Sequence, residues 1–256
     1  MGLQAKKSLG QHFLRSHRFL SAIAAAGDLA PDDTVLEIGP GEGTLTRELL
    51  SRVRKVIAIE KDHRMVPLLN TLFATEIKAK RLSIVHGDIL SVDISDLNLK
   101  KGKYKVVANI PYYISGALFR LFLESGTQPS SVTFLVQKEV AERIARSKKE
   151  SLLSLSVKAY GTPLYVSKVP RGAFVPPPSV DSAILTIRDI SRARFSGKKH
   201  EEAFFKLIHA GFAHKRKKLG KALTPYIGEA ADRVKDARAE DISITTWLEL
   251  AKNVQK

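Results

Sequence analysis

Short apolar runs alternate with amphipathic stretches over the first 150 residues of the chain. Unbroken apolar runs predict buried strands, whereas apolar positions that recur every three or four residues predict helices. The expected strands are Thr34–Ile38, Lys55–Ile59, Leu82–His86, Tyr104–Ala108 and Ser131–Val136. The expected helices are His17–Ala26, 43–52, Met65–Phe73, Gly116–Leu123 and Lys138–Arg146. This alternation predicts a doubly wound, mostly parallel α/β sheet.

The pattern changes after Glu150. A helix over 152–160 precedes two β-rich runs, Leu164–Val169 and Ser182–Arg188, which enclose a proline-rich loop. We expect these runs to pair at the sheet edge and to complete a seven-stranded sheet. From Ser191 onward the chain is helical and basic, with helices expected over 200–213, 216–224 and 240–254. The sequence therefore predicts an α/β domain over residues 1–190 and a small all-helical domain over residues 191–256.

Charge and composition narrow the class of protein. The 256 residues carry a formal net charge of +16, and so large an excess of cations favours polyanionic partners such as nucleic acid. The chain has no cysteine, which excludes disulfides, thiolate catalysis and the usual zinc sites. Its seven histidines show no metal-binding spacing, so we expect no catalytic metal. We find no signal peptide or membrane-spanning run, which is compatible with a cytoplasmic protein.

Polar and glycine residues follow the expected strands at the points where they end. A glycine turn follows the first strand, Glu60 the second, Asp88 the third and Asn109 the fourth. Because right-handed crossovers place the carboxyl ends of parallel strands along one edge of the sheet, these residues should lie together. Doubly wound sheets bind their ligands at that edge.

The glycine turn has the pattern E-x-G-x-G-x-G over residues 37–43. A dinucleotide-binding turn requires G-x-G-x-x-G, and its third glycine would stand where Thr44 stands. Glu37 would repel a pyrophosphate near Gly39 but would tolerate a ligand with an ammonium and a sulfonium, such as S-adenosylmethionine. Glu60 could accept hydrogen bonds from the two ribose hydroxyls, and Asp88 could accept one from the amine of the cofactor's adenine. The pattern favours S-adenosylmethionine over a nicotinamide cofactor, so a nicotinamide-dependent oxidoreductase is disfavoured.

The sequence N-I-P-Y follows the fourth expected strand. The exocyclic amine of adenine is a poor nucleophile because its lone pair is delocalised into the ring. The side-chain oxygen of Asn109 and the carbonyl of Ile110 could accept its two hydrogens and favour a pyramidal nitrogen. Pro111 stiffens the turn, and Tyr112 can stack on the target ring. We interpret the motif as the catalytic segment of an amino-methyltransferase, in which catalysis is mainly positioning.

Several motifs in register resemble the KsgA family of ribosomal RNA adenine dimethyltransferases. They include K-x-x-x-G-Q-H-F-L, E-I-G-P-G-x-G-x-L-T, I-E-x-D, G-D-I-L, N-I-P-Y-Y-I-S, V-Q-K-E-V-A-x-R, F-V-P-P-P-S-V-D-S-A and F-A-H-K-R-K-K-L. The resemblance implies a Rossmann-like methyltransferase fold and dimethylation of two adjacent adenines near the 3′ end of small-subunit rRNA. It implies that the helical domain docks on the immature subunit. It further implies cofactor contacts from His12, Leu14, Gly39, Glu60, Asp88 and Asn109.

Two relatives of that family remain as alternatives. The Erm resistance methyltransferases share the fold and modify one adenine in large-subunit rRNA, and Ile110 does not favour KsgA over them. A mitochondrial transcription-factor branch keeps the fold and can act as a DNA-binding factor. A binding protein in ribosome assembly or transcription, with methylation secondary, is therefore the other class of function.

The remaining features concern RNA. Phe174, in the proline-rich loop, could hold a flipped adenine against Tyr112, or it could plug the core beneath the hairpin. The densest basic run could contact phosphates or could be a solvated helix start; its residues are Lys215, Arg216, Lys217 and Lys218. Trp247 is expected in the core of a late amphipathic helix. We expect a monomer, since no apolar seam is evident.

Overall fold

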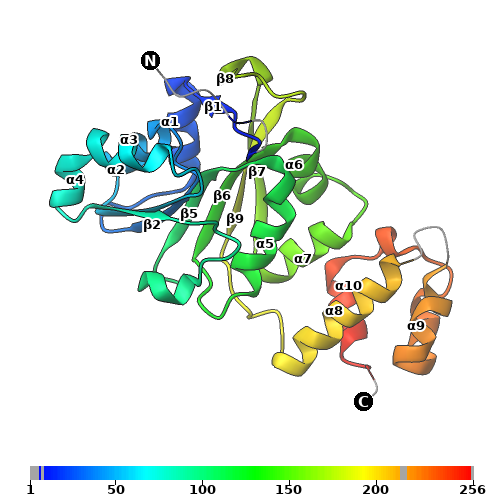
Figure 1. Cartoon of the computed structure of the whole chain (residues 1–256). Helices are drawn as coiled ribbons and strands as arrows, with labels where there is room; N and C mark the ends of the chain where they lie inside the picture. Colours follow the sequence, from blue (N-terminus) through cyan, green and yellow to red (C-terminus); the bar gives the residue numbers. More distant parts are fainter. Residues whose placement is uncertain (1–5, 7–8, 214–217, 255–256) are drawn as a thin grey trace. The chain divides into compact units, whose positions relative to one another are not determined.

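The computed structural model describes residues 6, 9–213 and 218–254. In this part of the chain, one seven-stranded sheet has the order β4-β3-β2-β5-β6-β9-β7 (Figure 1). Its strands are β2 (Thr34–Ile38), β3 (Lys55–Glu60), β4 (Leu82–His86), β5 (Lys105–Asn109), β6 (Ser131–Gln137), β7 (Thr162–Val169) and β9 (Ser182–Arg188). Strands β2 to β6 pair in parallel, and β9 runs antiparallel to β6. The predicted Rossmann-like, mostly parallel sheet is confirmed.

Helices alternate with these strands, as the apolar periodicity predicts. The α-helices of the described residues are α1 (His17–Ala26), α2 (Thr44–Leu50), α3 (Met65–Leu72), α4 (Ala74–Lys78), α5 (Ser115–Glu124), α6 (Lys138–Ala145), α7 (Leu152–Tyr160), α8 (Lys198–Phe212), α9 (Leu219–Ile227) and α10 (Ile244–Ala251). None of the helices in these residues combines the length and the apolarity needed to cross a membrane.

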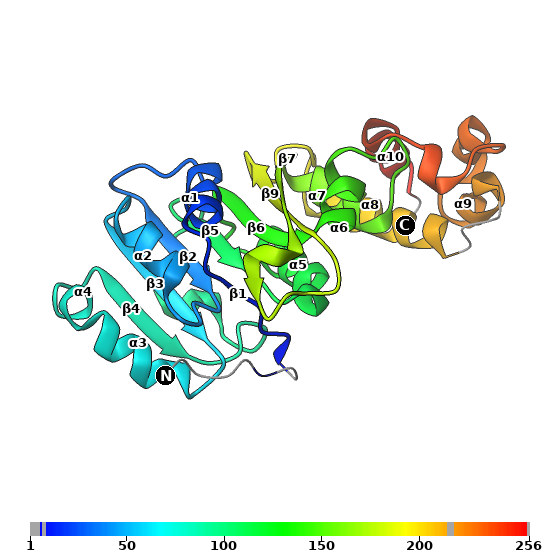
Figure 2. The same ribbon diagram turned by 90° about the horizontal axis from the view of Figure 1, so that it is seen from above.

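The sheet carries apolar side chains on both faces. Leu135 of β6 belongs to the cluster that α1, α2 and α3 cover, in company with Val35 of β2. Its neighbour Phe134 points to the other face, because successive residues of a strand alternate, and contacts Phe119 and Phe122 of α5. Helices therefore lie on both faces of the sheet (Figures 1 and 2).

A second, two-stranded sheet closes one end of this core. Strand β1 (Phe13–Leu14) pairs antiparallel with β8 (Phe174–Val175), and Leu14 lies opposite Phe174. Both Leu14 and Phe174 are 2% exposed and belong to the apolar core. The amino-terminal arm, the segment before α1, is thus held by pairing with a strand about 160 residues away in the sequence.

The chain divides into two compact units, which we describe separately. One unit comprises Met1–Ala141 and Leu164–Ile190, and the other comprises Glu142–Pro163 and Ser191–Lys256. The second unit therefore includes residues 142–163, which the sequence analysis placed in the first domain. The reason is an aromatic cluster, because Tyr160 of α7 packs on Phe195 and Phe205, and its hydroxyl donates to Glu201 at 2.5 Å. Trp247 is fully buried in this unit, as expected.

Candidate active site

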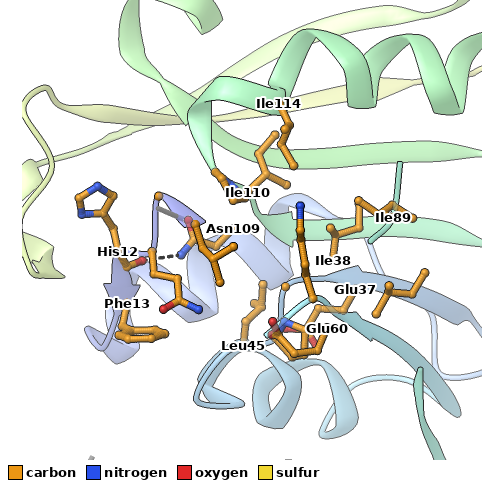
Figure 3. A pocket seen from close by; sticks show the side chains of 18 of the residues that line it. His12, Phe13, Glu37, Ile38, Leu45, Glu60, Ile89, Asn109, Ile110 and Ile114 are labelled. Atoms are coloured by element: carbon orange, nitrogen blue, oxygen red, sulfur yellow. Dashed lines mark hydrogen bonds between the residues drawn. The ribbon is translucent and has the colours of Figure 1, made fainter. Parts of the chain in front are cut away.

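A cleft opens at the carboxyl ends of the parallel strands. Its walls come from the amino-terminal arm, the glycine turn and the segments after β3, β4 and β5. The predicted cofactor and catalytic residues that line it are His12, Leu14, Gly39, Glu60, Asp88, Asn109, Ile110, Pro111 and Tyr112. The structure thus brings together residues that span 101 positions of the sequence, and Figure 3 shows several of them around the cleft.

The glycine turn follows β2 and leads into α2. Gly39, Gly41 and Gly43 all have positive φ angles, of 65°, 54° and 75°, which favour glycine over residues with a Cβ atom. A Cβ atom on Gly39 would meet no atom within 4 Å, so the backbone there faces open space in the cleft. A Cβ atom on Gly43 would lie 2.5 Å from the Phe73 ring, so this glycine is required by packing instead.

Glu60 is the acid at the end of β3, and backbone amides fix its carboxylate. The amides of Gly41 and Asp62 donate to Oε2 and Oε1 at 3.0 and 2.7 Å. Glu60 is 4% exposed, and burial raises its pKa, whereas the two amide hydrogen bonds lower it. The carboxylate is therefore held rigidly at the cleft wall, with lone pairs left over for ligand hydroxyls.

Glu37 is buried beneath the glycine turn, at 1% exposure. Its Oε2 accepts a hydrogen bond from the Thr46 hydroxyl at 2.7 Å. Burial raises the pKa of Glu37 from 4.5 to about 8, so the side chain is protonated at neutral pH in the protein alone. This refines the argument from the sequence, because Glu37 becomes a full negative charge only when a cation approaches it or the pH rises.

Asp88 follows β4 and is paired with a lysine that the sequence analysis did not single out. Lys61 Nζ lies 2.7 Å from Asp88 Oδ2, and the amide of Leu90 donates to Oδ1 at 3.0 Å. The hydrogen bond from Lys61 lowers the pKa of Asp88. Lys61 and Leu90 also line the cleft. Both residues could have been predicted from the sequence, because Lys61 directly follows Glu60 and Leu90 stands two positions after Asp88.

Asn109, the last residue of β5, is oriented by the amino-terminal arm. Its Nδ2 donates to the carbonyl oxygen of His12 at 3.2 Å, which leaves its Oδ1 as an acceptor (Figure 3). Ile110 is 2% exposed, so its side chain anchors the backbone of the motif. Pro111 has φ −60° and ψ 132°, and it turns the chain into the short helix Tyr112–Ile114.

The ring of Tyr112 is held between two distant segments. Its hydroxyl lies 2.5 Å from the hydroxyl of Ser182 at the start of β9, and burial raises its pKa. The His12 ring lies nearly parallel to it, with ring centroids 6.3 Å apart and planes inclined by 21°. Neither His12 as an aromatic neighbour nor Ser182 as an anchor was expected from the sequence.

A sequence model of the family described as "Ribosomal RNA adenine dimethylase" matches residues 2–256. The chain belongs to this family. The resemblance to KsgA is confirmed, and members of the family transfer methyl groups from S-adenosylmethionine, so this dimethylase is an S-adenosylmethionine-dependent methyltransferase.

Relatives of the dimethylase match it over nearly its whole length. "Ribosomal RNA small subunit methyltransferase A" of Dehalococcoides mccartyi is 42% identical, over 97% of this chain and 88% of the relative. The protein of the same name from Fusobacterium nucleatum is 36% identical, over 98% of each chain. The crystal structure of the 23S rRNA methyltransferase ErmE has a TM-score of 0.77 and 28% identity, and the match covers 95% of this chain and all of that one.

A more distant solved structure supports the fold alone. The dimethyladenosine transferase of Plasmodium falciparum has a TM-score of 0.80 at 24% identity, over 93% of this chain and 96% of that one. The cleft of the dimethylase fits S-adenosylmethionine in charge. Open space faces the Gly39 backbone, and four acidic side chains line the cleft, those of Glu37, Glu42, Glu60 and Asp88, whereas a pyrophosphate would require the opposite charge.

Some predicted RNA-binding residues do not lie where the sequence analysis expected them. Of the two roles expected for Phe174, its position in the structure matches the core plug, because Phe174 is 2% exposed, belongs to the apolar core and does not line the cleft. Lys215, Arg216 and Lys217 lie outside the described residues. Lys218 is described, and its Nζ is paired with Asp236 at 2.6 Å. Within the described residues, no group of three or more acidic or histidine side chains is arranged to hold a metal.

Proposed function

We propose that the protein dimethylates the N6 amines of two adjacent adenines near the 3′ end of small-subunit rRNA, within the immature subunit. The orientation of Asn109 carries the proposal, because its amide nitrogen is bound to His12 and its oxygen remains to accept from an amine. The names of the relatives support the small subunit as the substrate. We also propose that the protein is cytoplasmic and monomeric.

The cofactor site is proposed on the acids and the glycine turn. Glu60 accepts from the ribose hydroxyls, Asp88 from the adenine amine, and Gly39 gives the ligand close access to the backbone. His12 and Leu14 of the arm close the site from the other side. When bound, S-adenosylmethionine supplies an electrophilic methyl group on its sulfonium.

The chain's own residues prepare the target amine. Asn109 Oδ1 and the Ile110 carbonyl accept its two N–H groups, which favours a pyramidal nitrogen with an available lone pair. Tyr112 supports the flipped ring, and flipping costs roughly a few kcal/mol. Pro111 fixes the turn that holds these groups together. No general base is required before transfer, because the amine loses its proton to water after the new N–C bond has formed.

The helical residues 191–256, which make up most of the second unit, are proposed to dock the enzyme on the ribosomal subunit. The described part of this unit is rich in cations, and the run at Lys215–Lys218 would add phosphate contacts that release counterions. Residues 1–190 would then carry the chemistry and residues 191–256 the docking. The lysine that the structure describes in this run, Lys218, would exchange its Asp236 partner for a phosphate.

Methyl transfer from labelled S-adenosylmethionine tests the proposal. The substrates are undermethylated small subunits and protein-free large-subunit rRNA, and mass spectrometry identifies the modified nucleotides. Dimethyladenosine at paired adenines of the small subunit is expected. Asn109→Ala should abolish it, whereas Asn70→Ala, at an exposed position of α3, should not. Label in large-subunit rRNA alone would instead place the enzyme with the Erm methyltransferases.

An assembly factor in which methylation is secondary gives a different result. In that case Asn109→Ala would lose methyl transfer but still restore subunit assembly in cells that lack the wild-type protein. Loss of both would tie the biological role to catalysis.

A further inference from the structure

The side chain of Gln11 ties the amino-terminal arm to the segment that follows β3. Its Nε2 donates to Asp62 Oδ2 at 3.0 Å, and its Oε1 accepts from the backbone amide of Lys6 at 2.8 Å. Because the two ends of an amide group have opposite hydrogen-bonding roles, these two partners fix its orientation. Gln11 lines the cleft, but neither Gln11 nor Asp62 is among the proposed contacts to the cofactor or to the target amine.

Asp62 is a rigid partner for this hydrogen bond. It is 1% exposed, and Arg64 donates to the same carboxylate, with Nη2 at 2.6 Å from Oδ2 and Nε at 2.9 Å from Oδ1. The hydrogen bond from Arg64 holds the pKa of Asp62 well below its usual range, so Gln11 donates to a charged acceptor, and such bonds are the stronger ones. The backbone amide of Asp62 donates to Glu60 Oε1 at 2.7 Å. Asp62 therefore contacts both the arm and the acid proposed to bind the ribose.

The backbone carbonyl of His12, which orients Asn109, is held from both sides. His12 directly follows Gln11, and its carbonyl oxygen accepts from Asn109 Nδ2 at 3.2 Å (Figure 3). After His12, the chain is held by the β1–β8 pairing, which begins at Phe13. Before His12, it is held by the bond from Gln11 to Asp62. Without that bond, the His12 carbonyl is free to rotate away from Asn109, whose side chain then has no fixed orientation.

We propose that Gln11 is a positioning residue for methyl transfer, and that its bond to Asp62 holds the His12 carbonyl where it orients Asn109. The inference rests on the proposed function, in which Asn109 Oδ1 accepts from the target amine, and deepens it by naming the residues that set this orientation. Asp62 acts in two directions, because its amide fixes Glu60 and its carboxylate fixes the arm. Since Gln11 acts through Asn109, its loss should lower the rate of transfer more than the affinity for the cofactor.

An exchange of donor and acceptor tests the pair in the full-length enzyme. Gln11→Leu removes the hydrogen bond at similar size. Gln11→Glu places two carboxylates opposite each other, and Asp62→Asn leaves two amides and takes the anion away from Arg64. The double variant Q11E/D62N again pairs one carboxylate with one amide, so the hydrogen bond returns with its roles exchanged and the charge of the pair is unchanged.

The rate of the first methyl transfer is measured in a single turnover, on undermethylated small subunits at saturating cofactor. It should fall roughly ten- to hundredfold in Q11L, because misplacing a catalytic group by ~1 Å can cost about a hundredfold. Q11E/D62N should be at least about fivefold faster than Q11E, from the usual worth of one hydrogen bond. Arg15→Gln breaks an exposed ion pair between the same arm and Glu42. It is the control and should stay within about twofold of wild type.

The orientation of Asn109 can be observed directly by NMR. The chain has four asparagines, so protein labelled with 15N-asparagine gives four side-chain NH2 signals, and the signal that Asn109→Ala lacks belongs to Asn109. Its hydrogens should exchange slowly with water in wild type, because Nδ2 is bound to His12. In Q11L the exchange should be about tenfold faster, the usual effect of losing one hydrogen bond. The signals of the other three asparagines should stay unchanged.

Binding of S-adenosylhomocysteine, measured by calorimetry, separates a positioning role from a cofactor contact. Leu14 and Glu60 keep their own anchors in Q11L, since the Thr44 hydroxyl donates to the Leu14 carbonyl and the Gly41 amide donates to Glu60, both at 3.0 Å. The affinity should therefore change by less than about threefold. An affinity that falls as much as the transfer rate would overturn the inference and assign Gln11 to the cofactor. An unchanged rate or an unchanged Asn109 signal in Q11L would also overturn it.

Folding and the proposed function are controlled separately. If Q11L does not fold, the comparison of Q11E with Q11E/D62N decides, and equal rates in these two variants would overturn the inference. If wild-type protein transfers no methyl group, or if Asn109→Ala is as active as wild type, the proposed function fails. If Asn109→Ala is inactive and Q11L is as active as wild type, only the positioning role of Gln11 fails.

Discussion

The hydroxyl of Tyr112 lies 2.5 Å from the hydroxyl of Ser182, although 70 residues separate them. Ser182 is fully buried at the first position of β9, so its Oγ is a fixed anchor. Tyr112 follows the catalytic strand β5. This contact joins the ring proposed to stack on the substrate to β9, which lies two strands away from β5 in the sheet.

A double-mutant cycle tests whether Ser182 acts through Tyr112. Ser182→Ala and Tyr112→Phe should each lower kcat by about three- to tenfold, the usual worth of one hydrogen bond. The double variant should be no slower than the slower single variant, because both changes remove the same bond. Affinity for S-adenosylhomocysteine should stay constant. Effects that multiply in the double variant would show that Ser182 acts by another route.

The buried acid Glu37 predicts a pH-dependent stability. Its pKa is raised from 4.5 to about 8, so the folded protein keeps a proton that the unfolded chain releases. That stabilisation is complete below about pH 4.5 and is lost as the pH rises through about 8. Glu37→Gln stays neutral. Its free energy of unfolding should therefore rise relative to that of wild type as the pH rises, by at most about 1.4 kcal/mol per pH unit. Urea unfolding at pH 5, 6.5 and 8 measures the difference, and a difference independent of pH would contradict the prediction.

The same acid predicts that cofactor binding releases a proton. A cation in the cleft lowers the pKa of Glu37 from about 8, so binding near neutral pH should displace its proton. The affinity for S-adenosylmethionine should therefore rise between pH 6 and 8, by at most about tenfold per unit. Calorimetry in buffers of different ionisation enthalpy counts the protons. Glu37→Gln should release fewer protons, and equal release in both proteins would exclude Glu37 as the source.

Gly43 should tolerate no side chain. Its φ is +75°, and a Cβ atom there would lie 2.5 Å from the Phe73 ring. Gly43→Ala should destabilise the protein by roughly 1–3 kcal/mol and weaken cofactor binding, because the turn must shift. Gly116→Ala is the matched control, since no atom lies within 4 Å of that Cβ position. Thermal unfolding and S-adenosylhomocysteine titration report the two effects, and equal behaviour of the two variants would count against a strained turn.

Much of the fold could be predicted because its signals are local. The bounds of β2, β4 and β9 agree with the predicted Thr34–Ile38, Leu82–His86 and Ser182–Arg188. Buried strands and amphipathic helices leave their period in the sequence whatever surrounds them. The small α4 helix and the β1–β8 pairing were missed, because five- and two-residue elements are too short to show a period.

The division into units and the role of Phe174 were decided by packing. The sequence analysis assigned residues 142–163 to the α/β domain, yet Tyr160 packs within the second unit. Phe174 stands in a proline-rich loop, as an exposed substrate contact would, yet it pairs with Leu14 and is buried. Both outcomes depend on contacts between segments far apart in the chain.

The sequence by itself determined which segments form strands, which residues stand at the strand ends and which reaction the site carries out. It could do so because the glycine turn, Glu60, Asp88 and Asn109 each follow a strand whose end must reach one edge of a parallel sheet. Only the tertiary structure decided the protonation state of Glu37, the ion pair of Asp88 and the nearly parallel arrangement of the His12 and Tyr112 rings. Burial, charge pairing and ring spacing are set by neighbours in space, and for these residues the neighbours come from 9, 27 and 100 positions away.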